Sequence, residues 1–178
     1  MAIRRILQLG DPVLREISRE IGNVAEAAAT FADLRDTLHE FQRANGFGRG
    51  ISAVQIGALE RAIYIEFEGA QYRIANPMFE FRSIEKFRLW DDCFSFPDLL
   101  VYLERSQSVR LRYIDEHGSA QSIAASGPFS ELLQHEMDHL DGILAVDRAV
   151  NRNSLCTREE FQRVTGLKRG GAPARPIG

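Results

Sequence analysis

His135, Glu136 and His139 form the pattern His-Glu-x-x-His within the stretch Gln134 to Gly142. If this stretch is helical, the two imidazoles lie one turn apart on the same face, and Glu136 lies about 100° around the helix from them. Two neutral imidazoles bind a divalent ion well, and a carboxylate beside the ion can take a proton from water and return it to a leaving amine. The pattern therefore indicates metal-assisted hydrolysis. The alternative is a helix with surface histidines, because a five-residue pattern recurs by chance, so a third ligand is needed.

Cys93 is the predicted third ligand. A thiolate binds borderline-soft divalent ions strongly, and one cysteine with two histidines leaves a coordination position open, as catalytic sites do. The rival ligands are Glu159 and Glu160, which would reproduce the ligand set of a zinc protease. These glutamates fall in what reads as an exposed terminal helix. Cys156 lies in a polar stretch, and we interpret it as an incidental thiol.

A glycine-rich segment over residues 45–57 reads as a loop that leads into a short apolar run. Gly48 and Gly50 permit a close backbone approach or a positive φ, which suits a loop that grips an extended ligand. A phosphate loop is the competing interpretation, but no Lys-Ser/Thr pair follows the glycines. Gln55 lies in the apolar run, so its amide is either a structural bridge or a donor to a substrate oxygen.

The elements that must position these residues follow from periodicity and turn signals. An N-terminal arm is expected first, and the spacing of apolar residues then predicts an amphipathic helix over about 24–44. Short β-prone runs, broken at Asn76-Pro77, predict an antiparallel sheet with one buried face. Gly127-Pro128 precedes the helix that carries the histidines. The expected strands lie at 62–67, 71–75, 78–81, 84–90, 109–113 and 119–125.

Length, charge and cysteine content bound the class of protein. A chain of 178 residues fits one domain, and we expect a catalytic domain over 1–165 and a flexible tail over 166–178. A formal charge of -3 and a pI near 5.8 give no reason to expect direct nucleic-acid binding. Two cysteines, and the lack of a signal peptide or a membrane-length apolar run, favour a cytoplasmic protein without membrane association.

Three ordered motifs resemble those of the peptide deformylases, which remove the formyl group from N-formylmethionyl polypeptides. Residues 48–55 resemble Gly-x-Gly-Leu/Ile-Ala-Ala-x-Gln, residues 91–95 are similar to Glu-Gly-Cys-Leu-Ser, and residues 134–139 match Gln-His-Glu-x-Asp-His. The flanks also resemble the family, and the likeness spans about residues 3 to 165. The resemblance implies an α+β fold with antiparallel sheets around the motif helix.

The same resemblance assigns roles to residues. It implies one divalent ion, commonly Fe²⁺ with Zn²⁺ or Ni²⁺ able to replace it, held by Cys93, His135 and His139. Glu136 would be the general base and then the acid, while the Gln55 amide and the Phe94 backbone N–H would bind the developing oxyanion. The partner would be an N-formylated peptide or small N-formyl compound, with room for transient association with the ribosome. The residues expected along the substrate are Gly48, Arg49, Gly50, Ile51 and Asp92.

Two departures from the family pattern bear on function. Asp92 replaces the glycine before the ligand cysteine, and Arg49 replaces an aliphatic residue between the two glycines. We hypothesise that these opposite charges meet across the cleft and narrow it or select a polar substrate. Asp91 replaces a glutamate and is expected to pair with Arg105, while Asp138 is either a support for the metal ligands or a cap or ion-pair residue.

Three functions are consistent with this pattern. The first is hydrolysis of N-formylmethionyl peptides. The second is hydrolysis of another N-formyl or small N-acyl compound, for which a charged cleft would be useful. The third is metal binding without turnover, as an interaction module. A non-catalytic protein has no physical need for the ligands, the base and Gln55 together, which disfavours the third function.

Overall fold

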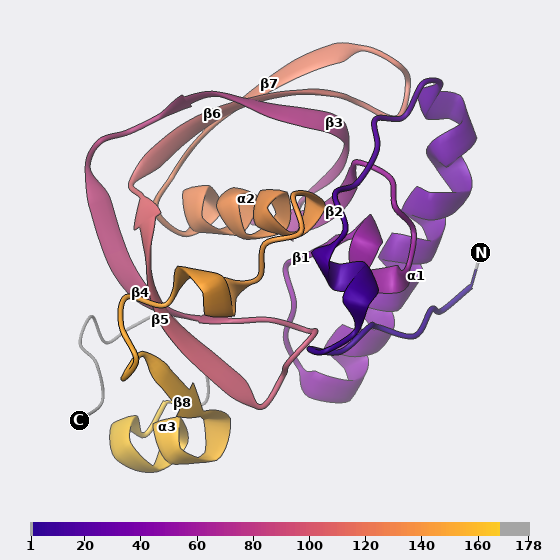
Figure 1. Ribbon diagram of the computed structural model, residues 1–178. Coiled ribbons are helices and arrows are strands. Elements are labelled where there is room, and N and C mark those ends of the chain that lie inside the picture. The colour runs from indigo at the N-terminus through magenta and orange to yellow at the C-terminus, as the bar shows by residue number, and fades with distance from the viewer. Residues whose placement is uncertain (1, 168–178) are drawn as a thin grey trace.

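The structure is a computed structural model that describes residues 2–167 (Figure 1). It consists of two antiparallel sheets and three α-helices, so the predicted α+β class is confirmed. The five-stranded sheet has the order β1-β2-β3-β6-β7, and the three-stranded sheet has the order β4-β5-β8. The strands of the two sheets are β1 (Gly50–Ser52), β2 (Ala62–Phe67), β3 (Ala70–Arg82), β4 (Lys86–Asp92), β5 (Leu99–Ser106), β6 (Ser108–Ile114), β7 (Ala120–Ser126) and β8 (Leu155–Thr157). The helices are α1 (Ala28–Asn45), α2 (Gly127–Leu140) and α3 (Arg158–Thr165), with 3-10 turns η1 (Pro12–Arg15), η2 (Val24–Ala27), η3 (Ala53–Ile56) and η4 (Ala145–Arg148).

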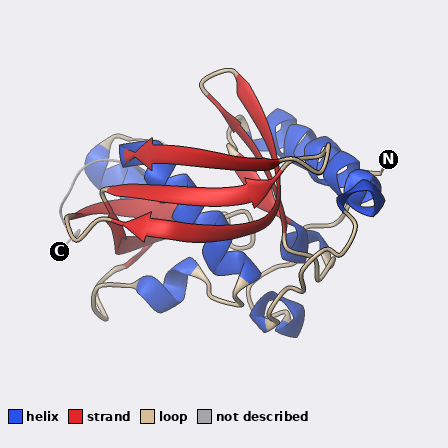
Figure 2. Cartoon of the chain, turned by 90° about the horizontal axis from the view of Figure 1, so that it is seen from above, coloured by secondary structure: helices blue, strands red, loops and turns tan. Residues whose placement is uncertain are grey.

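Helix α2 runs through the middle of the molecule, between the two sheets (Figure 1). Every residue from Ser130 to Leu140 is buried, because one side of the helix packs on the larger sheet and the other faces β4 and β5. Seen from above, the strands of the larger sheet cross over the helix (Figure 2). Leu133, Met137 and Leu140 pack with Ile63 and Leu111 of that sheet in one apolar cluster. The motif helix is therefore fixed by burial along its whole length.

Helix α1 lies against β1 and β2 on the outside of the molecule (Figure 1). Phe31, Leu34 and Leu38 are buried, as their spacing predicts. The first four residues of the helix predicted over about 24–44 form the 3-10 turn η2, which Asn23 caps through its side chain, and α1 begins at Ala28. Helix α1 ends at Gly46, whose left-handed φ of 71° closes the last turn.

The break expected at Asn76-Pro77 is a shift in register inside one long strand. Strand β3 continues to Arg82, but its pairing with β6 slips between Ala75 and Met78. Pro77 cannot donate a backbone hydrogen bond, so a register shift at this position lets the strand continue with the fewest lost hydrogen bonds. The side chain of Asn76 accepts from the backbone N–H of Ile21 and ties the N-terminal arm to this step.

The N-terminal arm lies over the motif segments. The backbone N–H of Leu7 donates to the carbonyl of Gln55 at 2.8 Å, and that of Leu9 donates to the carbonyl of Ser95 at 2.7 Å. The boundary between domain and tail stays a prediction, and residues 168–178 of the expected tail lie outside the described part of the chain. Within residues 2–167, no helix combines the length and apolar character that crossing a lipid bilayer requires.

Candidate metal centre

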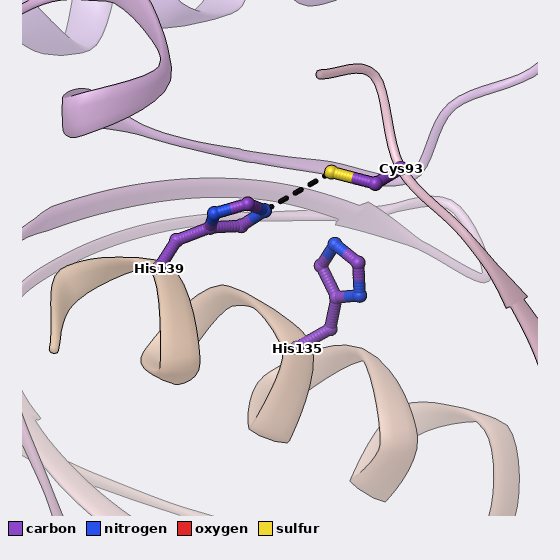
Figure 3. A group of neighbouring side chains, drawn as sticks. All are labelled: Cys93, His135 and His139. Atoms are coloured by element: carbon purple, nitrogen blue, oxygen red, sulfur yellow. Dashed lines mark hydrogen bonds between the residues drawn. The ribbon is translucent and has the colours of Figure 1, made fainter. Parts of the chain in front are cut away.

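Cys93, His135 and His139 converge at one point (Figure 3). Both imidazoles rise from one face of α2, and Cys93 reaches them from the loop that follows β4. The Cys93 Sγ and the His139 Nε2 are 3.2 Å apart, and one donor atom from each of the three residues lies within 4.8 Å of the others. All three side chains are buried. The structure thus brings Cys93 to the two neighbouring histidines of α2, although 46 positions of the chain separate it from His139.

This donor set fits a divalent ion. In a tetrahedral site, sulfur at about 2.3 Å and nitrogen at about 2.0–2.1 Å from the ion are about 3.5 Å apart, close to the observed separation. One thiolate and two imidazoles are soft and borderline donors, the type that Zn²⁺, Fe²⁺ and Ni²⁺ accept. Three protein ligands leave a position for water or substrate, which is the pattern of a catalytic site.

A buried carboxylate orients His135. Its Nδ1 donates to Asp91 Oδ2 at 3.0 Å, which leaves Nε2 as the ring atom that an ion would bind in place of a proton. Burial acts to lower the pKa of His135, but the charge and hydrogen bond of Asp91, with Cys93, raise that pKa well above its usual value. Burial and the positive charge of His135 lower the pKa of His139 well below its usual value.

Arg105 holds Asp91 in place, as predicted. Its Nη2 lies 3.2 Å from Asp91 Oδ2, and both side chains are almost fully buried. The other side of the guanidinium pairs with Asp138, whose second oxygen accepts from Arg148 at 2.8 Å. Asp138 is therefore an ion-pair residue that supports the centre through Arg105. Burial alone would raise the pKa of Asp91, but His135 and Arg105 lower it far below its ordinary value.

Glu136 lies beside the ligands and is gripped by Ser52. The Ser52 hydroxyl donates to Glu136 Oε2 at 2.6 Å, and the same hydroxyl is 3.0 Å from the Glu136 backbone carbonyl. A Cβ on Gly50 would lie only 2.8 Å from Glu136 Oε1, so glycine is needed there. Burial raises the pKa of Glu136, which the charge of His135 and the bond from Ser52 partly offset.

Gln55 points its amide into the same site. Its Oε1 accepts from the Ser52 backbone N–H at 2.9 Å, which fixes Nε2 near Cys93 Sγ at 3.6 Å and Ser95 Oγ at 3.3 Å. Phe94 follows Cys93 directly, and its ring stacks on Phe41 of α1 at 3.9 Å between centroids. Gly48 has φ +134°, and a Cβ there would lie 2.8 Å from the Phe94 ring. The loop before β1 (residues 46–49, the glycine loop) and the loop after β4 (residues 93–98, the cysteine loop) are thus packed against each other.

The expected contact between Arg49 and Asp92 is wrong. Arg49 Nη2 pairs instead with Glu131 Oε2 at 2.7 Å, while Asp92 pairs with Arg158 at 2.9 Å. Glu131 lies on α2 one turn before His135, on the face that points to the centre. Arg49 pairs with Glu131 and not with Asp92 because the Glu131 side chain is only 4% exposed, and a buried carboxylate needs a counter-ion.

Arg49 and Asp92 line one cavity of about 600 Å³ that opens from the candidate ligands. Gly48, Gly50, Gln55 and Phe94 also line it. Ile51 does not, because its side chain is fully buried in the cluster beneath α1. A contact of Ile51 with substrate would therefore have to be made by its backbone in β1.

The rival ligands lie elsewhere. Glu160 is exposed on α3 and pairs with Arg163, and Glu159 is exposed beside it. Cys156 lies in β8 and belongs to neither of the metal-ligating groups among residues 2–167. His39 of α1 lies 2.8 Å from Glu66 on β2. The arrangement around α2 can therefore hold an ion, take up a proton at Glu136 and donate from Gln55.

Comparison with known proteins identifies the family. The sequence model of the polypeptide deformylase family matches residues 3–154. The chain belongs to this family. Deformylases are metal-dependent hydrolases that act on the amide bond of N-formylmethionyl peptides, and this chain is one of them.

Individual deformylases match nearly the full domain. The peptide deformylase of Brucella suis biovar 1 is 33% identical over 153 residues, which covers 83% of this chain and 85% of the relative. The structure of the Thermotoga maritima deformylase superposes with a TM-score of 0.79 at 26% identity, over 85% of this chain and 100% of that one. The Synechococcus elongatus deformylase, solved in complex with actinonin, gives a TM-score of 0.77 at 30% identity, over 85% of this chain and 87% of that one.

Two polar residues at this deformylase site escape sequence reasoning. In the sequence, Ser52 is only a small residue in place of the family's alanine. Its hydrogen bond to Glu136 spans 84 positions of the chain, so no local pattern predicts it. Glu131 does carry a signal, because residues 131, 135 and 139 share one helical face. That spacing places a third ionisable side chain beside the two histidines.

Proposed function

We propose that this chain removes formyl groups from N-formyl peptides at a centre formed by Cys93, His135, His139 and Glu136. The observation that carries the proposal is the convergence of a buried thiol and two imidazoles beside a buried carboxylate, where Cys93, His135 and Glu136 line one cavity. The reaction adds the oxygen of water to the formyl carbon and breaks the bond from that carbon to nitrogen. The products are formate and a free amine.

Glu136 moves the proton in this proposal. It takes a proton from the attacking water and gives it to the leaving nitrogen. Ser52 holds Oε2, so Oε1 is the oxygen that faces Gly50 and the cavity. A divalent ion bound at the centre supplies Lewis-acid polarisation and lowers the pKa of water in the site.

Gln55 and Phe94 receive the developing negative charge on the formyl oxygen in this proposal. The Gln55 carbonyl is engaged by Ser52, so its amide can only present Nε2 to the centre. The backbone N–H of Phe94 would be the second donor. One preorganised donor of this kind is worth about 3 kcal/mol in the transition state.

Two edge strands flank the cavity and support binding of an extended peptide. Strand β1 ends the strand order of the larger sheet, and β4 ends that of the smaller sheet. Unpaired strand edges offer backbone donors and acceptors to an added strand. Gly48 and Gly50 would let the peptide backbone come close. The substrate partner in this proposal is the N-terminus of a new polypeptide, met in the cytoplasm with transient contact to the ribosome and no direct contact to nucleic acid.

Fe²⁺ is the proposed metal, with Zn²⁺ or Ni²⁺ able to substitute. The test is purification without oxygen, followed by measurement of bound metal and of the release of free amine from formyl-Met-Ala-Ser. Glu136→Ala should keep its metal and lose about 10²- to 10⁴-fold in kcat/KM. Glu159→Ala, at an exposed glutamate of α3, is the matched control and should behave as the unaltered protein. Hydrolysis that survives in Glu136→Ala would refute the base assignment.

A further inference from the structure

The cavity beside the centre has one apolar wall and one ionic wall. Phe87 and Leu89 of β4 contribute the apolar wall. Arg49, from the glycine loop, and Glu131, from α2, contribute the ionic wall. A cavity with both surfaces fits a side chain that is apolar along its length and polar at its end.

The ionic wall lies close to the reacting centre. A carboxylate oxygen of Glu131, a carboxylate oxygen of Asp91 and a ring nitrogen of His135 all lie within 4.8 Å of one another. Asp91 is occupied by His135 and Arg105. A group bound next to the centre would therefore meet Glu131 and its partner Arg49.

The two members of the ion pair differ in exposure. The Glu131 side chain is 4% exposed, and burial with the charge of Asp91 raises its pKa, against the effect of Arg49. The Arg49 side chain is 43% exposed and also donates to the Pro128 carbonyl at 3.3 Å. A ligand in the cavity meets the guanidinium first and can reach the edge of the carboxylate behind it.

We propose that the Arg49–Glu131 pair selects N-formyl substrates whose first side chain ends in a carboxamide, with glutamine as the best fit. This inference rests on the proposed function, because that function places the formyl carbon at the centre and the adjoining side chain in the cavity. The carboxamide oxygen accepts from Arg49 and its nitrogen donates to Glu131, while the methylene groups lie along Phe87 and Leu89.

Methionine and glutamate have side chains of similar length to glutamine but fit the ionic wall less well. A methionine side chain removes water from the guanidinium and replaces none of its hydrogen bonds, which costs free energy. A glutamate side chain brings a third carboxylate to a site that already holds Glu131 and Asp91, and the like charges repel each other. The expected order of binding is therefore glutamine, then methionine and glutamate.

Binding can be measured separately from turnover. The metal-loaded Glu136→Ala protein is titrated with formyl-Gln-Ala-Ser, formyl-Met-Ala-Ser and formyl-Glu-Ala-Ser, and each Kd is measured by calorimetry. The glutamine peptide should bind about tenfold more tightly than the methionine peptide, the effect of one net hydrogen bond to a charged group. Equal affinity for the glutamine and methionine peptides, or tighter binding of the methionine peptide, would overturn the proposal. This test needs no substitution of Arg49 or Glu131.

The double variant Arg49→Leu/Glu131→Leu removes both charges, which avoids leaving one buried ion without a partner. Made in the Glu136→Ala protein, it should reverse the Kd ratio in favour of methionine. Glu160→Leu/Arg163→Leu removes an exposed ion pair of α3 and should leave the ratio unchanged. A ratio that the pocket variant does not alter would also overturn the proposal.

Turnover separates this inference from the proposed function. If the unaltered protein hydrolyses none of the three peptides but its Glu136→Ala variant still prefers glutamine in binding, the pocket assignment stands and the proposed function fails. If it hydrolyses formyl-Met-Ala-Ser with the highest kcat/KM and binds it most tightly, the proposed function stands and the selectivity proposal fails.

Discussion

At the scale of single residues, the hydroxyl of Ser52 is the group that holds Glu136. Its bond of 2.6 Å to Glu136 Oε2 fixes the carboxylate that we propose as the base. Ser52→Ala frees that carboxylate to rotate, so kcat should fall about tenfold, the effect of losing a hydrogen bond to a charged group. The metal content and KM should stay the same, and steady-state kinetics with formyl-Met-Ala-Ser would show the split.

Ser18→Ala provides the control for this substitution. Ser18 is also buried, and its hydroxyl has no hydrogen-bond partner among residues 2–167. The same atom is lost in both variants, but only Ser52 touches Glu136. Equal kinetics for the two variants would show that the hydroxyl of Ser52 has no part in the reaction.

The chemistry of single residues explains how much of the site could be predicted. His135 and His139 share a helical face whatever surrounds them, and thiolate chemistry favours Cys93 over an exposed glutamate. The partner of Arg49 could not be predicted, because two acidic residues were available and the choice depends on which one the fold buries. The sequence-based hypothesis chose Asp92, whereas burial of Glu131 makes it the carboxylate that requires a cation.

At the scale of elements, Glu66 joins β2 to α1 and to the glycine loop. Its carboxylate accepts from Tyr64 at 2.8 Å and from Gln42 at 3.3 Å, and it lies 2.8 Å from His39. Gln42 also donates to the Gly48 carbonyl at 3.0 Å, so this cluster helps to hold the loop that lines the cavity. Burial alone would raise the pKa of Glu66, but the hydrogen bonds from its neighbours lower it.

Stability should therefore depend on pH through Glu66. Because the pKa of Glu66 is lower in the folded state, its contribution is complete above the unfolded value of about 4.3 and is lost as pH falls through the folded value. Glu66→Gln should lower the free energy of unfolding by about 1–2 kcal/mol at pH 7, and the difference should vanish in acid. Urea unfolding from pH 7 to pH 3 measures it.

Glu85→Gln is the control for that series, since the Glu85 side chain is exposed in the turn before β4. It should change stability little at any of these pH values. A deficit in Glu66→Gln that persists undiminished at the lowest pH would show that lost packing, and not the ionised carboxylate, causes it.

The elements themselves were largely predictable, and their exact course was not. Alternation of apolar residues gave Val109 to Tyr113 as a strand, and the structure has β6 there. The Asn76-Pro77 step was expected to end a strand, because proline cannot donate to a ladder. Pairing of β3 with β6 on either side of the step outweighs that local preference, and such long-range pairing is invisible to local patterns.

At the scale of the whole molecule, the proposed metal would connect two parts of the fold. Cys93 follows β4 of the smaller sheet, whereas His135 and His139 lie on α2, which packs on the larger sheet. An ion that binds the folded chain alone stabilises it by about 2.7 kcal/mol at a concentration one hundred times its Kd. For a chain of this size, each kcal/mol raises Tm by about 2–4 °C.

Removal of the metal should therefore lower Tm by about 5–10 °C, measured by calorimetry before and after anaerobic dialysis against a chelator. Return of Fe²⁺ or Zn²⁺ should restore the original Tm, and activity should return with it. Cys93→Ala should have the lower Tm from the start and show no response to chelator, because one of its three ligands is missing. Cys156→Ala should respond as the unaltered protein does. A chelated protein that loses its metal and keeps its Tm would place the ion away from the junction between α2 and the smaller sheet.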